Sequence, residues 1–207
     1  MPADATVARA ENRKEITDVR VLSALAHPVR LQLLGYLLEM GPRTATECSA
    51  EVDATPSACS YHLRHLERFG LVERADAADG PARERADGRE RRWRAAATGF
   101  SFGKRPSESS AAVSAAQQAL TAVRVDDGAR LAHQFLERSD ETTTDWLDAS
   151  AFATYGLAAT PAELAELVAG IDRLLRPYIA ATRADPPDGS RPVHVTVQAF
   201  PRAEGER

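Results

Sequence analysis

The stretch DATPSACSYHLRHLERFG, residues 53–70, restricts the local fold more than any other part of the chain. Thr55 can cap a helix, Pro56 suits the first helical turn, and Gly70 is a good C-terminal stop. At about 100° per residue, one face of such a helix carries an apolar set, Cys59, Leu63, Leu66 and Phe69, with His62 alongside. The opposite face carries Ser57, Ser60, Tyr61, Arg64 and Arg68. The stretch therefore predicts a sharply bounded helix from Pro56 to Phe69 with one buried face and one polar face.

Two further helices and a short third one are predicted before this stretch. Apolar residues at helical spacing run through residues 16–41 and are interrupted at His27-Pro28, which predicts two helices, the second ending at Gly41. Thr44 and Glu47 have the spacing of a capping box, so a short helix should begin there and bury Cys48 and Val52.

A β-hairpin is predicted after Gly70. LVERAD (71–76) and RERRWRAAA (89–97) resemble two strands that flank a charged loop rich in turn-forming residues. Six arginines lie in and after this loop: Arg83, Arg85, Arg89, Arg91, Arg92 and Arg94. Glu84, Asp87 and Glu90 dilute their charge, so some of these arginines are expected to pair with neighbours. Three helices followed by a hairpin form the order of a winged helix-turn-helix, in which the third helix reads DNA.

The polar face of the third helix has the chemistry of a DNA-reading surface. Small side chains near the helix N-terminus, with Tyr and Arg further along, can enter a major groove and offer donors to bases and phosphates. An ordinary solvated face is the alternative. We predict base-edge contacts by Tyr61 and Arg64, supported by Ser57 and Ser60. Phosphate contacts are predicted for Arg68, Arg85, Arg89 and Arg91.

The charge of the chain limits where DNA could bind. The net charge is −4, whereas a protein that binds a polyanion usually presents a basic surface. Residues 20–98 contain 12 arginines and 11 acidic residues, a net of +1. Residues 99–207 contain 11 basic and 15 acidic residues, a net of −4. Any basic footprint must therefore be local.

Three stretches give the chain a resemblance to the ArsR-type winged helix-turn-helix regulators of bacteria. They are LSALAHPVRLQLLGYL, ATECSAEVDATPSACSYHLRHLERFGLVERA and GRERRWRAA, and together they cover about residues 17–98. The resemblance implies a homodimer that binds an inverted-repeat operator of double-stranded DNA, usually as a repressor, and releases it when a signal arrives. The second half resembles the extra C-terminal region of actinobacterial relatives.

The resemblance does not extend to metal sensing. Where many family members carry two cysteines on the helix before the reading helix, this chain has Thr44 and Thr46, and the paired ligands of the dimer helix reduce to His133. Cys59 and His65 would lie about 9 Å apart along a helix axis, too far to share one tetrahedral ion at about 2.0–2.3 Å. We expect no metal site and no cofactor.

The second half of the chain predicts a mostly helical domain. Helices are expected at 111–124, at 129–138 and from a capping box at Thr160 and Glu163, ended or kinked by Pro177. PVHVTVQAFP (192–201) alternates with period two, which predicts a strand paired with the region around 150–158. The fold class is therefore mainly α with small β (α+β). Its parts are a flexible tail (1–16), a winged helix-turn-helix (17–98), a linker (99–110) and a C-terminal dimerisation domain (111–207).

These features predict a homodimeric, sequence-specific regulator of transcription. The C-terminal domain either only extends the dimer interface or also holds a pocket for a small apolar effector. A winged helix used for protein contacts alone is the alternative function. No catalytic motif occurs in the sequence, so an enzyme is not expected. No apolar run approaches the roughly 20 residues of a membrane span, and the polar N-terminus lacks a signal-peptide pattern. We therefore expect a cytoplasmic, nucleoid-associated protein.

Overall fold

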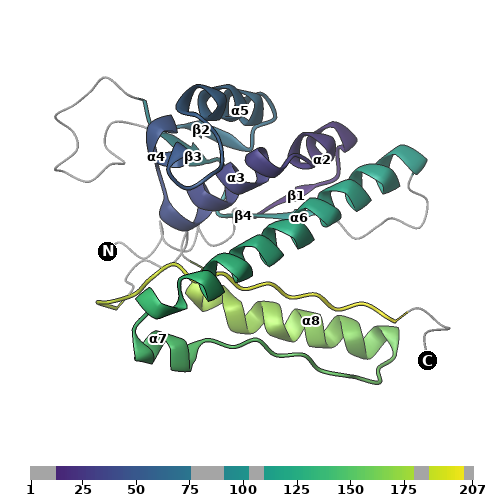
Figure 1. Ribbon diagram of the computed structural model, residues 1–207. Coiled ribbons are helices and arrows are strands. Elements are labelled where there is room, and N and C mark those ends of the chain that lie inside the picture. The colour runs from purple at the N-terminus through teal and green to yellow at the C-terminus, as the bar shows by residue number, and fades with distance from the viewer. Residues whose placement is uncertain (1–12, 76–90, 103–109, 180–186, 203–207) are drawn as a thin grey trace, which may run out of the picture. The chain divides into compact units, whose positions relative to one another are not determined.

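The computed structural model describes residues 13–75, 91–102, 110–179 and 187–202, which form two compact units (Figure 1). The described residues up to Asp127, together with 187–192, make the first unit, and residues 128–179 with 193–202 make the second. Helix α6 (Ala111–Glu137) begins in the first unit and ends in the second.

Four helices at the N-terminal side build the first unit: α2 (Val19–Leu25), α3 (Pro28–Met40), α4 (Ala45–Ser49) and α5 (Pro56–Arg68). The chain bends by 90° between α2 and α3, because Pro28 cannot continue α2 but fits the first turn of α3. Gly41 ends α3 with a φ of 73°, a conformation that glycine adopts without steric cost. The predicted capping box of Thr44 and Glu47 is present in both directions at the start of α4.

The predicted hairpin is confirmed. Strands β2 (Val72–Arg74) and β3 (Trp93–Ala95) are antiparallel, with Arg74 opposite Trp93. A further backbone pair joins Trp93 to Arg43, in the turn between α3 and α4. The base of the hairpin is therefore tied to the helices by its own backbone.

A second pair of strands differs from the sequence expectation. Residues Arg13–Ile16 (β1) and Gly99–Phe102 (β4) form a parallel ladder, although the sequence placed the first in a flexible tail and the second in a linker. Neither segment shows a strong strand pattern by itself: β1 is mostly exposed. The pairing depends on the helices and hairpin bringing two distant segments together, which a local pattern cannot indicate.

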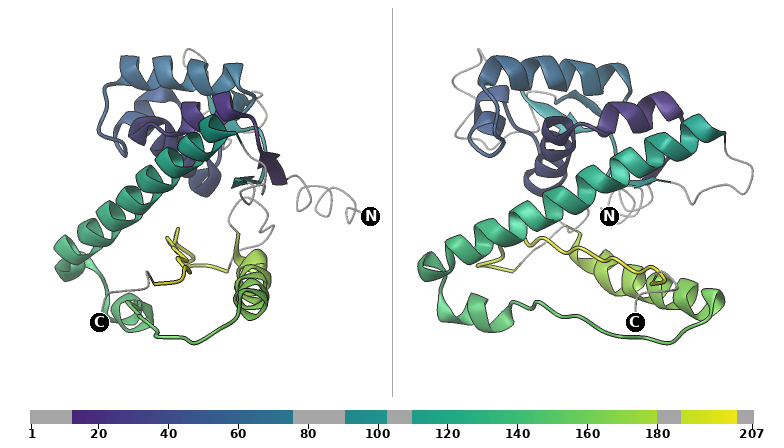
Figure 2. Two further views of the ribbon diagram at one scale, coloured as in Figure 1. Left: turned by 90° about the vertical axis from the view of Figure 1, so that its right-hand side faces the viewer. Right: turned by 45° about the vertical axis from the view of Figure 1, so that its right-hand side comes forward.

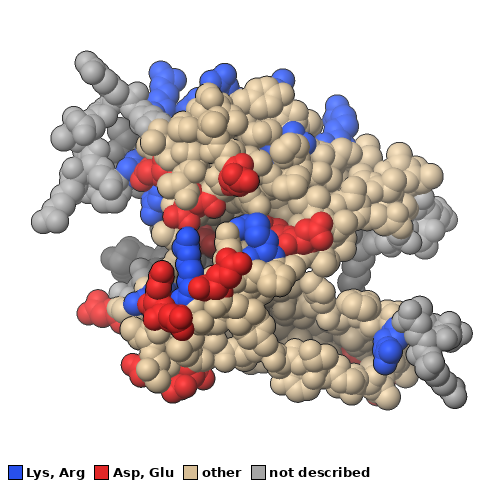
Figure 3. Space-filling view, in the orientation of Figure 1, with Lys and Arg blue, Asp and Glu red and all other residues tan. Residues whose placement is uncertain are grey.

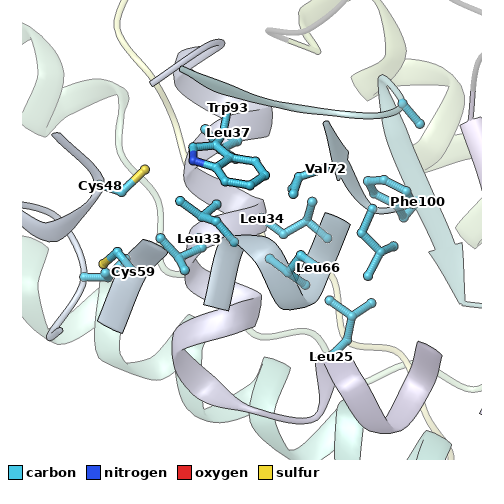
Figure 4. Packing of buried hydrophobic residues seen from close by; sticks show 14 of the residues in the cluster. Leu25, Leu33, Leu34, Leu37, Cys48, Cys59, Leu66, Val72, Trp93 and Phe100 are labelled. Carbon is cyan, nitrogen blue, oxygen red and sulfur yellow. The ribbon is translucent and has the colours of Figure 1, made fainter. Parts of the chain in front are cut away.

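One apolar cluster holds the first unit together. Figure 4 shows Trp93 of the hairpin beside Leu37 of α3 and Val72 of β2, with Cys48 and Cys59 at one side of the cluster. Trp93 is 2% exposed, and Leu33, Leu63 and Leu66 are fully buried. Because burying a leucine contributes about 1.5–3 kcal/mol, this cluster is the main source of stability for the helices and the hairpin base.

The second unit consists of the end of α6, then α7 (Thr144–Ala149) and α8 (Pro161–Leu175), with 3₁₀ turns at Ser139–Glu141 and Arg176–Tyr178. The sequence predicted two helices within 111–138, and this is wrong, since α6 is continuous. Gly128 costs a helix interior only about 1 kcal/mol, too little to break it. The capping box of Thr160 and Glu163 is present, and α8 ends two residues before Pro177 as predicted.

The strand predicted at 192–201 is not found. Within the described residues it has no strand partner, and the region 150–158 is not a strand either. A period-two pattern specifies an extended backbone, which the segment has, but it does not supply a partner (Figure 2). The overall class, mainly α with few short strands, is confirmed.

A membrane span is not evident in the described part of the chain. No single helix there is long and apolar enough to cross a bilayer, and only α2 and α3 taken together, across their 90° bend, pass the same test of length and composition.

Candidate nucleic-acid interface

Helix α5 has the boundaries and the two faces that its sequence predicts. The Thr55 hydroxyl accepts a hydrogen bond from the Ala58 backbone N–H at 3.2 Å, and Pro56 occupies the first turn. Gly70, at a φ of 64°, follows the last turn. The helix therefore begins and ends through local interactions, and its rotation about its own axis is decided by packing.

The apolar face of α5 fixes that rotation. Cys59, Leu63 and Leu66 are fully buried in the core cluster, against α3 and α4. Phe69 is half-buried at the edge of the cluster. The opposite face is consequently turned outward.

The outward face carries the predicted DNA-reading residues. Tyr61 is 57% exposed, Ser57, Arg64 and Arg68 are exposed, and Ser60 is half-buried. Ser57 hydrogen-bonds the capping Thr55 through their hydroxyls at 3.1 Å, and Arg68 lies 3.3 Å from the His65 ring. Arg64 has no hydrogen bond or ion pair among the residues that the structure describes. It is therefore available to an external acceptor.

Basic side chains gather where α5 meets the hairpin. The Arg74 guanidinium stacks over the Trp93 ring, 3.4 Å from its centroid. Burial lowers the pKa of Arg74; the carboxylate of Glu67 opposes this, and the neighbouring charges of Arg91 and Arg64 add to it. Arg64, Arg74 and Arg91 thus lie close enough to repel one another, and a phosphate would relieve that repulsion. Figure 3 shows Lys and Arg side chains along the rim that α5 occupies.

Two of the hairpin arginines hold the hairpin in place. Arg94 forms an ion pair with Glu73 at 2.8 Å across the strands. Arg92 lies 3.7 Å from Glu47 and donates to the Pro42 carbonyl at 3.2 Å. The expectation that some hairpin arginines pair with neighbours is therefore confirmed.

The remaining hairpin predictions divide by position. Arg91 is exposed beside β3. Arg83, Arg85 and Arg89 lie outside the described residues.

Arg74 is the residue of this surface that sequence reasoning missed. It lies in a three-residue strand, and nothing in VER distinguishes a surface ion pair from a cation stacked on a ring. The signal is the hairpin register, which places Arg74 opposite Trp93. That register depends on the core position of Trp93 and not on the local sequence.

Two histidines flank the outward face from beneath. The His62 and His27 rings are 4.7 Å apart, and each ring has a buried Nδ1 without a hydrogen-bond partner in the structure. Burial lowers the pKa of His62, and the charges of His27, Arg30 and His65 lower it further. Burial is also the main cause of the lowered pKa of His27. Both rings are therefore packed as neutral groups, as the sequence indicated for His62 at the edge of the core.

The cysteines belong to the packing. Cys48 and Cys59 are free thiols, both fully buried. Burial raises the pKa of Cys48 to about 12 and also raises the pKa of Cys59. Within the described ranges, no group of three or more His, Cys, Asp or Glu side chains is arranged to hold a metal ion.

A capped helix with an outward polar face, held by two helices and tied to a hairpin beside it, defines the first unit as a helix-turn-helix domain of the kind found in DNA-binding regulators. Residues 25–75, which include α3, α4, α5 and β2, match the family model of a helix-turn-helix domain. No match to the chain was found among curated proteins. The match thus covers the reading helix and its support and leaves the second unit outside it.

Proposed function

We propose that the protein is a homodimeric, sequence-specific transcriptional repressor of the ArsR type that acts on an inverted-repeat operator and does not sense a metal. The observation that carries this proposal is the outward face of α5, where exposed Tyr61 and unpaired Arg64 adjoin the basic group of Arg74 and Arg91. A surface of this kind meets both requirements of DNA recognition, which are donors for base edges and cations for the backbone. The protein would act in the cytoplasm, at the nucleoid.

Each predicted contact residue has a role that its position allows. Tyr61 and Arg64, on the outermost line of α5, would reach base edges in the major groove, and Ser57 and Ser60 would support them. Arg68 near the end of α5 and Arg91 beside β3 would hold phosphates on either side, together with Arg85 and Arg89 of the hairpin loop. Arg74 would hold the charge of this surface in place through its stacking on Trp93.

Dimerisation follows from the size of the reading surface. One helix in a groove buries little area, whereas a two-fold dimer doubles the contact on a pseudo-palindrome. The second unit would supply contacts between the two copies. Binding of a small effector to that unit would then change DNA affinity by altering the separation of the two reading helices.

A second candidate is a winged helix that binds an acidic protein. The overall charge of −4 and the pairing of Arg92 and Arg94 within the domain favour it, since they reduce the charge offered to DNA. In that case the outward face of α5 would bind carboxylates and show no sequence preference on DNA.

Selection of genomic fragments by the purified full-length protein tests the proposal. The expected result is enrichment of a palindrome whose half-sites are about 10 bp apart, one turn of DNA. A parallel selection with Arg64→Ala should lose the enriched motif while retaining weak, salt-sensitive binding. Absence of any enrichment at low salt would overturn the proposal and favour the protein-binding alternative.

A further inference from the structure

The second unit lacks a buried core. Among its described residues none is fully buried, and large apolar side chains of α8 and of both extended segments are exposed. Tyr155 is 79% and Leu174 is 73% exposed. Soluble monomers rarely leave contiguous apolar patches of more than a few hundred Å² exposed, so these side chains require a partner.

The extended segment 193–200 shows which way its apolar side is turned. A Cβ built at Gly128 of α6 would lie 3.1 Å from the Thr196 Oγ1 and 3.8 Å from the His194 ring. Thr196 and His194 also hydrogen-bond each other at 2.7 Å, which places them on one side of the segment. The polar side therefore packs on the protein's own helix.

The other side consists of Val193, Val195 and Val197, which we call the valine face. Their exposed fractions are 60%, 55% and 47%. A strand that packs its polar side inward and presents three valines outward is inverted relative to a strand that completes a monomeric core. The cover of the valine face must therefore come from outside this unit.

Charge narrows the choice of partner to a second copy. Residues 193–200 contain no Asp, Glu, Lys or Arg, and neither do residues 150–162, the other exposed extended segment. Two copies can therefore meet along these segments without like charges facing each other, although the second half of the chain as a whole is acidic. A partner selected for its charge would find none here to bind.

The available area is sufficient for a stable dimer. With roughly 80–100 Å² left uncovered on each large apolar side chain, the second unit offers on the order of 1,000 Å² per copy. A standard stable interface needs about 800 Å² per partner.

We propose that the valine face packs against the valine face of a second copy, with the two-fold axis passing near Val195, the central valine. This inference rests on the homodimer of the proposed function and assigns the surface that forms it. In a two-fold contact each surface meets its own copy, so each substitution at the valine face acts twice.

Sedimentation velocity of the full-length protein tests the assignment. Val195→Asp places two uncompensated carboxylates in the interface and should raise the dimer dissociation constant at least about 100-fold. Gln198→Asp, an exposed position on the same segment but off the valine face, is the matched control and should leave the dissociation constant within about threefold of the unsubstituted protein. Circular dichroism should show equal helix content for both variants.

Cross-linking gives a second readout that does not require a destabilising change. Val195→Cys should form an intermolecular disulfide under mild oxidation, because the two central positions face each other across the axis. Gln198→Cys should do so at least about tenfold more slowly. The native thiols are buried and contribute little background.

The outcomes separate this inference from the proposed function. A monomeric unsubstituted protein at tens of micromolar, or equal effects of Val195→Asp and Gln198→Asp, would overturn the valine-face dimer even if a palindromic operator is recovered. Conversely, a dimer broken only by Val195→Asp supports it even if no operator is found.

Discussion

Replacing Arg64 by alanine should remove sequence discrimination and leave the fold intact. A bidentate contact between an arginine and a guanine edge is worth about 1–3 kcal/mol. The dimer would use the residue twice, so the operator should lose about 2–6 kcal/mol, or about 30-fold to 20,000-fold in affinity. Because Arg64 is exposed and has no ion pair among the described residues, the free energy of unfolding should change by no more than about 0.5 kcal/mol.

The assay is fluorescence anisotropy with an operator duplex and a random duplex at several salt concentrations. Affinity for random duplex should fall much less, since only the charge of Arg64 contributes there, and the slope of log affinity against log salt should become shallower.

Arg94→Ala is the matched control for this experiment. It removes the same charge from the same domain, but its guanidinium is held 2.8 Å from Glu73. It should weaken binding to both duplexes slightly and equally. The reasoning is refuted if Arg64→Ala weakens operator and random duplex by the same factor, or if Arg94→Ala shows the same loss of discrimination.

Three further predictions concern the core beneath this surface. Leu63→Ala, at a fully buried position, should lower the free energy of unfolding by about 2–5 kcal/mol in denaturant titrations, and a loss below about 1 kcal/mol would contradict the packing described. Since burial lowers the pKa of His27 and His62 below 6.5, the unfolded chain binds protons that the folded one does not, and stability should fall as pH decreases from about 7 to 5; His62→Gln should flatten this dependence, and an unchanged slope would exclude His62 as a cause. With the pKa of Cys48 raised to about 12 and Cys59 also buried, both thiols should react with a disulfide reagent at pH 8 only after unfolding, whereas rapid reaction of the native protein would show that the thiols are accessible.

The arrangement at α5 also accounts for a domain that can be basic locally within an acidic protein. Glu47, Glu67 and Glu73 lie against arginines below or beside the outward face. They neutralise the arginines that hold the hairpin and leave Arg64 and Arg91 on the outside. The net charge of the chain is therefore a poor guide to the charge of this surface.

Local signals were sufficient for the helices and for the two faces of α5. Thr55 with Pro56, Thr44 with Glu47, and the His27-Pro28 break each act within one or two helical turns. Because such caps satisfy backbone groups close in sequence, they are readable before any fold is known. The same is true of the helical spacing that turns Leu63 inward and Arg64 outward.

Pairing between distant segments was not readable in this way. The parallel ladder of β1 and β4, the register that stacks Arg74 on Trp93, and the unpartnered segment at 193–200 all depend on which chain segments meet. A period-two pattern states that a backbone is extended, and a single apolar alternation states which side is to be covered, but neither names the covering segment.

The sequence by itself determined the capped helices, the break at Pro28 and the chemistry of the α5 surface, because these arise from interactions within a few residues. Only the tertiary structure decided that Arg92 and Arg94 hold the hairpin while Arg64 and Arg91 remain exposed, and that Val193, Val195 and Val197 face away from the protein's own helix. These outcomes depend on the packing of segments far apart in the chain, where burial and pairing are set by all the neighbours together.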